Sequence, residues 1–195
     1  MKEKQQEGTR ERGNIKQMAY IGMSAALLAV LSQLSIPMPG GAPMTLQIFG
    51  VALLGVVFGW KTGAASVLVY LCIGLAGLPI FANFKGGLGC FAGTTGGYLI
   101  SFPVLAAFAG IRWKMEREWQ QVMLALVWGL IGLAIVESVG AIWWSAVAGG
   151  QWTLQAVALY SLAAFVPKDI LLVTLAVIVG RPIRRILMKA GLMEK

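Results

Sequence analysis

The chain has 195 residues, of which 58% are hydrophobic and 12% are charged, and its mean hydropathy is +0.77. Such a composition excludes an ordinary soluble domain and indicates a small polytopic membrane protein. The net charge of +8 is then explained by membrane orientation, with anionic inner-leaflet lipid as its neighbour, and we expect no nucleic-acid partner.

Polar, Gly-rich and Pro-rich breaks divide the sequence into six apolar segments. Residues 1–14 are polar and are expected to form a mobile cytoplasmic tail, followed by one transmembrane domain over residues 15–195. The second and third segments are short for a bilayer core of about 30 Å. The predicted helices cover, to within a few residues, 15–36, 45–59, 62–78, 94–111, 119–147 and 155–180.

The positions of the 16 Lys and Arg residues predict the topology. If the N-terminus is cytoplasmic, all of them except Lys85 and Lys168 lie in the cytoplasm or at its membrane surface. Positive residues in short flanking loops fix the orientation of membrane proteins. The sequence therefore predicts an all-α integral membrane protein, a bundle of six transmembrane helices with both termini cytoplasmic.

Two breaks contain residues that disfavour regular helix. Residues 37–43 hold three Pro and two Gly, which predicts an extended lid or turn at the outer surface. Residues 77–98 contain seven Gly and cannot form one helix at reasonable cost. Irregular backbone at membrane depth is tolerated where it lines a cavity. We therefore look for a ligand here first, although an ordinary outer loop is an alternative.

Two acidic residues fall inside apolar helices, Glu137 and Asp169, and both are expected in the outer half of the membrane. A charge at such depth costs at least about 2.5 kcal/mol, so it is expected to face the bundle interior and to have a partner. Lys168 is next to Asp169, but successive helical residues point in different directions and need not pair. Pro167 is expected to kink the last helix.

Aromatic and polar side chains surround the Gly-rich segment. Asn83 follows Phe81, and Tyr98 begins the next helix, a combination that suits a mostly apolar small ligand fixed by a few hydrogen bonds. We interpret three tryptophans near the outer surface as members of the interfacial aromatic belt. They are Trp143, Trp144 and Trp152.

The sequence lacks the residues of a catalytic centre. It contains no His and only two Cys, which excludes most general-base and metal chemistry. In Gly59-Trp60-Lys61-Thr62, Trp60 stands where a phosphate-binding loop requires Gly. We therefore expect no enzyme, no metal and no cofactor, and any ATP hydrolysis that drives transport must occur in another subunit.

Four blocks resemble a known family: PMTLQIFGVALLG (43–55), VLVYLCIGLAGLPIFANFKGGLG (67–89), TGGYLISF (95–102) and VPKDILL (166–172). They are similar to the BioY family, the biotin-specific substrate-binding (S) subunits of energy-coupling-factor (ECF) transporters. The resemblance implies a six-helix bundle in the plasma membrane of a prokaryote that captures biotin from the outer side. Its implied partners are a transmembrane coupling subunit and two ATPase subunits.

The resemblance also implies site residues. Asn83, Tyr98 and Asp169 match family positions at the biotin pocket, and Phe81 belongs to the block that precedes Asn83. Biotin would be the transported ligand, with Asp169 accepting a hydrogen bond from a ureido N–H and Asn83 able both to donate and to accept.

Two further pairs are assigned from the same comparison. Thr45 and Gln47 are expected in the gating loop at the outer surface. Ala25 and Ala29 match the small-residue motif on the first helix that docks on the coupling subunit. Plain packing inside the bundle is an equally weighted alternative for these two alanines.

The sequence departs from the family pattern near Asp169. Lys168 stands where Gly is usual, Leu172 stands where Lys is usual, and Thr94 stands where Pro is common. The positive charge for the biotin carboxylate must then come from Lys168 or Lys85, of which we prefer Lys168, unless the carboxylate stays hydrated near the outer surface. An alternative function, an intramembrane ion or proton pathway using Glu137, Lys168 and Asp169, leaves the Gly-rich segment without a role.

Overall fold

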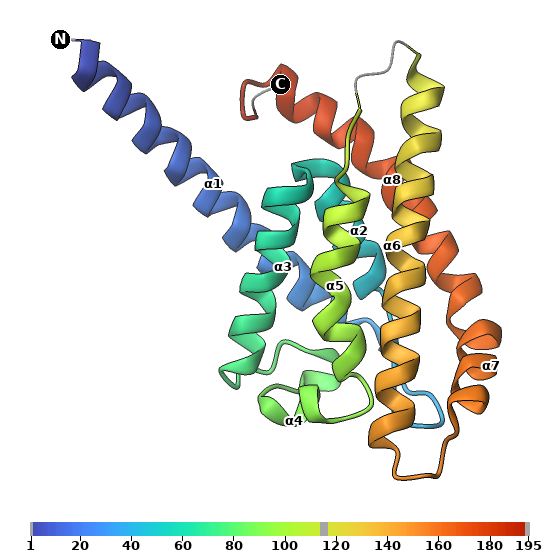
Figure 1. Cartoon of the computed structure of the whole chain (residues 1–195). Helices are drawn as coiled ribbons and strands as arrows, with labels where there is room; N and C mark the ends of the chain where they lie inside the picture. The colour runs from blue at the N-terminus through green and yellow to red at the C-terminus, as the bar shows by residue number, and fades with distance from the viewer. Residues whose placement is uncertain (1, 114–116, 194–195) are drawn as a thin grey trace.

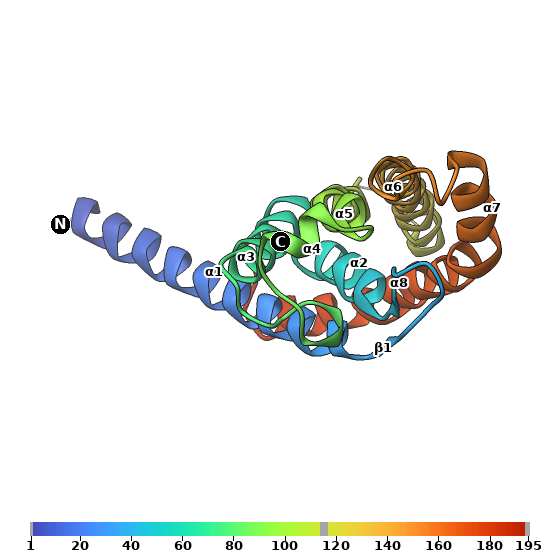
Figure 2. The same ribbon diagram turned by 90° about the horizontal axis from the view of Figure 1, so that it is seen from below.

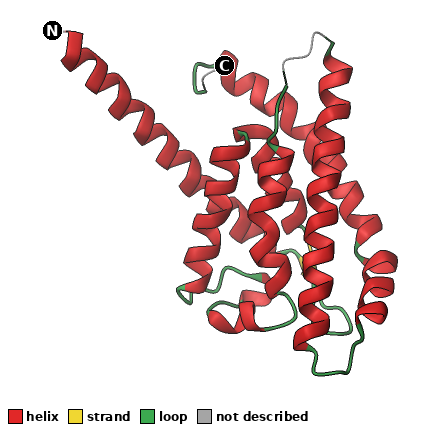
Figure 3. Ribbon diagram, in the orientation of Figure 1, coloured by secondary structure: helices red, strands yellow, loops and turns green. Residues whose placement is uncertain are grey.

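The computed structural model describes residues 2–113 and 117–193, with the side chains of the first helix described from Ile15 onward. The described chain is a bundle of helices with one small strand pair (Figures 1 and 3). Its elements are α1 (Lys2–Gln33), β1 (Ser35–Ile36), β2 (Met44–Thr45), α2 (Gln47–Phe58), α3 (Trp60–Leu75), a 3₁₀ turn (Ala82–Phe84), α4 (Leu88–Ala92), α5 (Gly96–Ala109), α6 (Glu118–Val147), α7 (Leu154–Ala164) and α8 (Val166–Lys189).

Small residues let the helices pack closely around α2, which lies among its neighbours in the view along the bundle (Figure 2). A side chain at Gly55 would come within 2.2 Å of the Ala106 carbonyl oxygen on α5, and one at Gly63 within 2.8 Å of Gly55 itself. Close backbone approach of this kind is typical of membrane helices, which lack a hydrophobic drive to associate in lipid. The apolar core between these helices includes fully buried Val51, Val67 and Leu105.

The lengths of the helices differ. Residues 15–33 of α1 and the whole of α6 are long and apolar enough to cross a membrane, and α7 and α8 meet the same criteria together, as either a broken span or a re-entrant loop. Helices α2, α3 and α5 are shorter, with 12, 16 and 14 residues. The six predicted segments thus correspond to α1, α2, α3, α5, α6 and the bent pair α7–α8.

The first helix begins earlier than residue 15, where the sequence predicted its start. Helix α1 begins at Lys2 and runs without a break to Gln33, projecting away from the bundle at its N-terminal end (Figure 1). Residues 2–13 are rich in Glu, Lys, Gln and Arg, which are good helix formers even without an apolar face.

The last predicted helix, which was expected to kink at Pro167, is broken into two helices. It is divided at Phe165 into α7 and α8, which meet at an angle of 49°. Pro167 lies in the first turn of α8, where its missing N–H removes no helical hydrogen bond. The kink expected from Pro167 is therefore a true break, and it places Lys168 and Asp169 at the beginning of a helix.

The Pro-rich loop is closed at its base by the two short strands. Ser35 pairs with Thr45 and Ile36 with Met44 in an antiparallel ladder. Consequently α1 ends at Gln33 and α2 begins at Gln47, so that Thr45 belongs to a strand rather than to the second helix.

The Gly-rich segment is irregular, as predicted. It contains the 3₁₀ turn and the five-residue helix α4, and it returns on itself through a bridge between Phe81 and Lys85. Asn83 and Phe84 have φ values of +59° and +55°, an uncommon conformation for residues other than Gly. This segment lies at the end of the bundle opposite the C-terminal end of α8 (Figure 1).

Candidate functional site

A cavity of about 380 Å³ lies at the end of the bundle that carries the Gly-rich segment. Its volume falls within the range of about 300–1,000 Å³ that is usual for small-molecule sites. The walls come from the loop after α1, the start of α2, the Gly-rich segment, α5, α6 and the junction of α7 with α8. The sequence-predicted pocket and gating residues all line it: Thr45, Gln47, Phe81, Asn83, Tyr98, Lys168 and Asp169.

Lys168 and Asp169 form an ion pair in the cavity wall. The Lys168 Nζ lies 2.6 Å from Asp169 Oδ1 and also donates a hydrogen bond of 3.1 Å to the Thr45 carbonyl oxygen. The sequence left direct pairing of these neighbours open. The structure pairs them because both lie at the start of α8, where the long Lys side chain can fold back toward the adjacent carboxylate.

Glu137 reaches the same cavity from α6. Its carboxyl group is paired with the Asp169 carboxyl group through a side-chain hydrogen bond, so one of the two acids carries a proton, and the residue is only 9% exposed. Within the described part of the chain, Glu137 Oε2 has no hydrogen-bond partner. Sequence reasoning had placed Glu137 only in the ion-pathway alternative, and its expected depth in the membrane, shared with Asp169, was the one signal that the two could meet.

The two expected gating residues are buried in the wall. Gln47 donates a 2.8 Å hydrogen bond through Nε2 to the Tyr70 hydroxyl, which donates in turn to the Ile80 carbonyl oxygen at 3.0 Å. The Thr45 hydroxyl donates to Gln47 Oε1 and accepts from the Gln47 backbone N–H, both at 3.2 Å. This network fixes the Gln47 amide at the base of the Pro-rich loop.

Tyr98 is held by α6 and α7. Gly140 on α6 leaves room for its ring, since a side chain there would approach within 2.3 Å of it. The Tyr98 hydroxyl lies 3.2 Å from Ser161 Oγ on α7, and its ring centroid is 6.5 Å from that of Phe165, which also lines the cavity. The ring therefore forms a fixed aromatic wall.

Phe81 and Asn83 present different faces of the Gly-rich segment. Phe81 is buried, with its ring edge-on to Tyr70 at 5.4 Å and to Phe91 at 5.7 Å. Asn83 is exposed, and its Oδ1 accepts a 3.0 Å hydrogen bond from the Ser35 hydroxyl. The Asn83 side chain thus joins the Gly-rich segment to the base of the Pro-rich loop.

Lys85 is an exposed cation at the cavity wall. Among the described residues it forms no ion pair. Its charge acts on Cys90: burial raises the pKa of the Cys90 thiol, and Lys85 opposes that rise. Lys85 is therefore close to the cavity and has an ammonium group available for an anion.

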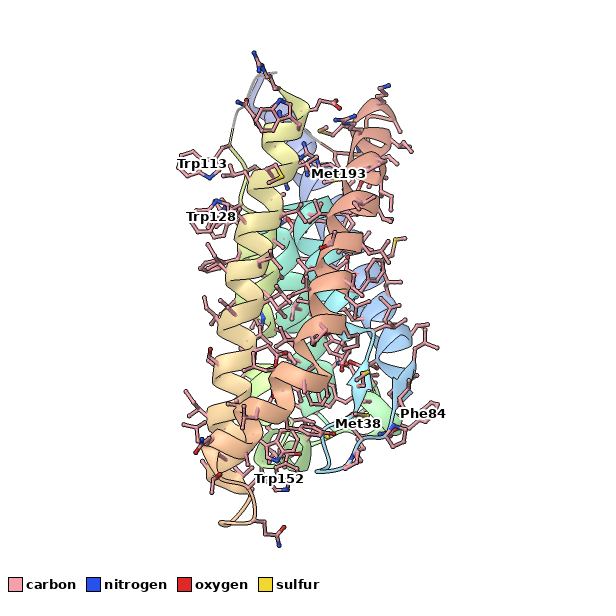
Figure 4. The ribbon with its side chains drawn as sticks, turned by 90° about the vertical axis from the view of Figure 1, so that its right-hand side faces the viewer. Met38, Phe84, Trp113, Trp128, Trp152 and Met193 are labelled. Atoms are coloured by element: carbon pink, nitrogen blue, oxygen red, sulfur yellow. The ribbon has the colours of Figure 1, made fainter. Side chains whose placement is uncertain are left out.

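A separate aromatic cluster supports the Pro-rich loop. Trp144 is fully buried and contacts the rings of Trp152, Tyr160 and Phe165, so the interfacial-belt interpretation is wrong for Trp144. A side chain at Gly40 would come within 2.5 Å of the Trp144 ring. Figure 4 shows Trp152 and Met38 together at this end of the bundle, opposite Trp113 and Met193.

The two alanines of the expected docking motif lie away from the cavity. Ala25 is 4% exposed and belongs to the apolar core, and Ala29 is half-buried against the same core. Gly22 and Ala26, on another face of α1, are exposed. Packing within this bundle accounts for Ala25.

Comparison with known proteins places the whole arrangement in one family. The family model described as the BioY family matches residues 2–189. A biotin transporter BioY of Rhodobacter capsulatus is 33% identical over 183 residues, covering 86% of this chain and 93% of that protein. A probable biotin transporter BioY of Pyrococcus horikoshii is 40% identical over 117 residues, covering 60% of this chain and 72% of that protein.

A solved structure is similar over nearly the whole chain. The crystal structure of the S-component for biotin from an ECF-type ABC transporter superposes with a TM-score of 0.76 at 28% sequence identity. The match covers 89% of this chain and 93% of that chain.

Proposed function

This chain belongs to the BioY family, and from that membership we propose that it takes up biotin as the substrate-binding subunit of an ECF-type transporter. Relatives that align with most of its length are named biotin transporters, and the similar solved structure is an S-component for biotin. Biotin uptake is the function that these comparisons and the cavity support together.

The observation that carries the proposal is the match between the cavity and the chemistry of biotin. Biotin has a ureido group with two N–H donors and one carbonyl acceptor, an apolar fused ring system and a tail that ends in a carboxylate. The cavity combines a cluster of two acids and one Lys, an aromatic wall, and a separate exposed cation at Lys85. An apolar pocket with a few fixed polar groups is the usual form of such a site.

In the proposed complex, the ring end of biotin lies at α8. The Asp169 carboxylate accepts a hydrogen bond from one ureido N–H, while Phe81 and Tyr98 flank the fused rings. The Asn83 amide supplies a further donor, since its Oδ1 is already engaged by Ser35. Charge-assisted hydrogen bonds to a buried carboxylate are the strongest contacts available for such a group.

The biotin carboxylate is assigned to Lys85 rather than to Lys168. The Lys168 ammonium already contacts the Asp169 carboxylate and the Thr45 carbonyl oxygen, whereas Lys85 is exposed and close to the cavity. This reverses the preference that the sequence suggested, and it places the charged end of the ligand near solvent, where its desolvation costs least.

The topology and the partners follow from the same assignment. Six passes with both ends in the cytoplasm agree with the basic residues of α8 and the preceding loops. The chain would reside in the plasma membrane of a prokaryote, with anionic lipid at its basic surface. A transmembrane coupling subunit and two ATPase subunits would supply the ATP hydrolysis for which this sequence has no phosphate-binding loop.

Uptake of radiolabelled biotin tests the proposal. The chain is expressed with an ECF coupling subunit and its two ATPases in cells that lack their own biotin transporter. The expected result is uptake that excess unlabelled biotin abolishes and that a matched unlabelled vitamin of another class does not. Ion flux without biotin binding would instead support the pathway alternative through Glu137, Lys168 and Asp169.

A further inference from the structure

The cavity contains one buried acid for which the proposed function gives no role. Glu137 on α6 is 9% exposed, lines the cavity and directly neighbours Asp169. Apart from the hydrogen bond that its carboxyl group shares with Asp169, its Oε2 atom is buried and receives no donor among the residues that the structure describes. A buried acceptor is normally satisfied, and an ionisable residue inside a membrane bundle normally serves a function. Both points indicate that a ligand donor completes this site.

The neighbouring groups define which ligand would do so. Asp169 Oδ1 likewise lacks a hydrogen bond of good geometry in the described residues, apart from its ion pair with Lys168. The Lys168 ammonium has three N–H donors, of which the contacts to Asp169 and the Thr45 carbonyl oxygen engage two. The cluster therefore offers two carboxyl acceptors and one remaining ammonium donor.

Building on the proposed function, we infer that Glu137 is a specificity-determining residue for the ureido ring. The Glu137 carboxyl group accepts a hydrogen bond from the second ureido N–H, while Asp169 accepts from the first. The remaining Lys168 N–H donates to the ureido carbonyl oxygen. The two N–H donors of the ureido group thus meet the two carboxyl groups, and the carbonyl acceptor between them meets the Lys168 ammonium group.

This arrangement predicts strict selection for a ring with two N–H groups. A cyclic carbamate analogue of biotin, in which oxygen replaces one ring N–H, has nearly the same shape but turns a lone pair toward a carboxyl oxygen. A site built to pair a polar group rejects an analogue without that group far more strongly than an apolar pocket rejects a change of size.

The test measures the affinity of the purified full chain for biotin and for the two carbamate analogues, one with each ring N–H replaced. For the wild-type chain we expect both analogues to bind at least about tenfold more weakly than biotin. Glu137→Gln should lower the affinity for biotin. It should also reduce the affinity ratio between biotin and one of the two analogues, because the new amide can donate a hydrogen bond to the ring oxygen of that analogue. Asp169→Asn should narrow the discrimination against the other analogue.

Glu118→Gln is the matched control, because it makes the same acid-to-amide change at the start of the same helix, on an exposed residue paired with Arg185. It should leave the affinity ratio of biotin to each carbamate analogue unchanged. The wild-type measurement needs no variant, so the inference can be tested even if Glu137→Gln does not fold. If the wild-type chain binds biotin but also binds one of the analogues as tightly, the two carboxyl groups do not pair with both ring N–H groups, and the inference is overturned while the proposed function stands. If the folded wild-type chain does not bind biotin, the proposed function fails and the inference fails with it.

Discussion

The ammonium group of Lys168 connects Asp169 to the base of the Pro-rich loop, with Nζ 2.6 Å from Asp169 Oδ1 and 3.1 Å from the Thr45 carbonyl oxygen. These two contacts join the start of α8 to strand β2 across the cavity wall. Lys168 therefore already has its counter-charge. It sets the position and charge of the Asp169 carboxylate, and in the inferred complex its remaining N–H donates to the ureido carbonyl oxygen.

The first prediction concerns Lys168→Met, which keeps an unbranched side chain of nearly the same length and removes the charge. It should lower the affinities for biotin and for biotin amide to the same extent, by at least about tenfold, because a buried acid loses its paired cation. Equilibrium binding of both ligands to the purified variant measures this. A loss confined to biotin itself would show instead that Lys168 contacts the ligand carboxylate.

Lys85→Met should behave differently. We expect biotin to lose affinity by about two- to fivefold, the size usual for an exposed ion pair, while biotin amide keeps its affinity because its tail is neutral. The loss for biotin should also shrink at high salt. Equal affinities of wild type and variant for biotin would exclude Lys85 as the carboxylate partner.

A third prediction concerns how the Pro-rich loop is held over the cavity. A Cβ atom at Gly40 would lie 2.5 Å from the Trp144 ring, so Gly40→Ala should push the loop away from the aromatic cluster. The dissociation rate of biotin should rise severalfold, and the intrinsic tryptophan fluorescence should change because Trp144 loses its packing. The dissociation rate is measured by displacing bound fluorescent biotin with excess unlabelled biotin in a stopped-flow instrument. The packing of Trp144 is followed by the intrinsic tryptophan fluorescence of the same variant.

Gly41→Ala separates this clash from backbone strain. Gly40 and Gly41 have nearly the same positive φ, +94° and +92°, but a Cβ at Gly41 would meet only Thr94 Oγ1 at an ordinary 3.5 Å. Gly41→Ala should therefore have the smaller effect on dissociation and leave the Trp144 signal in place. Identical dissociation rates for the two variants would show that strain, rather than contact with Trp144, controls the loop.

Asn83 allows its side-chain role to be separated from its backbone role. Asn83 has φ +59°, which Gly adopts freely and Ala does not. Asn83→Gly should keep the thermal stability of the wild-type chain within a few degrees and weaken biotin binding, whereas Asn83→Ala should lower both. Biotin affinity of Asn83→Gly equal to that of wild type would remove Asn83 from the binding site.

The exposed face of α1 that carries Gly22 and Ala26 is accessible to a coupling subunit, and it gives another contrast. Ala25 is buried in the core, so Ala25→Leu should overpack the bundle and destabilise it by about 1–3 kcal/mol. Ala26 is exposed, so Ala26→Leu should leave stability and biotin binding intact and reduce co-purification with a coupling subunit. If the Ala25→Leu chain is stable but fails to co-purify with the coupling subunit, Ala25 itself takes part in docking.

The sequence predicted the helical segments because apolar runs and Gly or Pro breaks are local signals. The irregular segment at 77–98 follows directly from its seven Gly. The sequence predicted a kink at Pro167 but not a full break at Phe165, because a Pro in the first turn of a new helix and a Pro inside a kinked helix produce the same sequence pattern. The helical start at Lys2 was missed because a polar helix without an apolar stripe resembles an unstructured tail.

For the site, the residues predicted from the family blocks line one cavity, including Phe81 and Tyr98, and their role in binding stays a prediction. Whether Lys168 points at its neighbour or at the ligand depends on the bend before α8, which composition does not specify. The approach of Glu137 to Asp169 joins residues on α6 and α8 that are 32 positions apart in the chain. No local pattern encodes such a contact, and the shared depth of two buried acids was only a weak indication of it.

Equilibrium binding of labelled biotin to the purified wild-type chain and to Asp169→Asn tests the central claim most directly, with thermal unfolding in detergent as the check that both are folded. The wild-type chain should bind one biotin per chain saturably, and Asp169→Asn should bind at least about tenfold more weakly, because a charged acceptor for a buried N–H is replaced by an amide with donors of its own. If folded wild-type chain shows no saturable binding, or if the two affinities are equal, the cavity at Asp169 is not the biotin site.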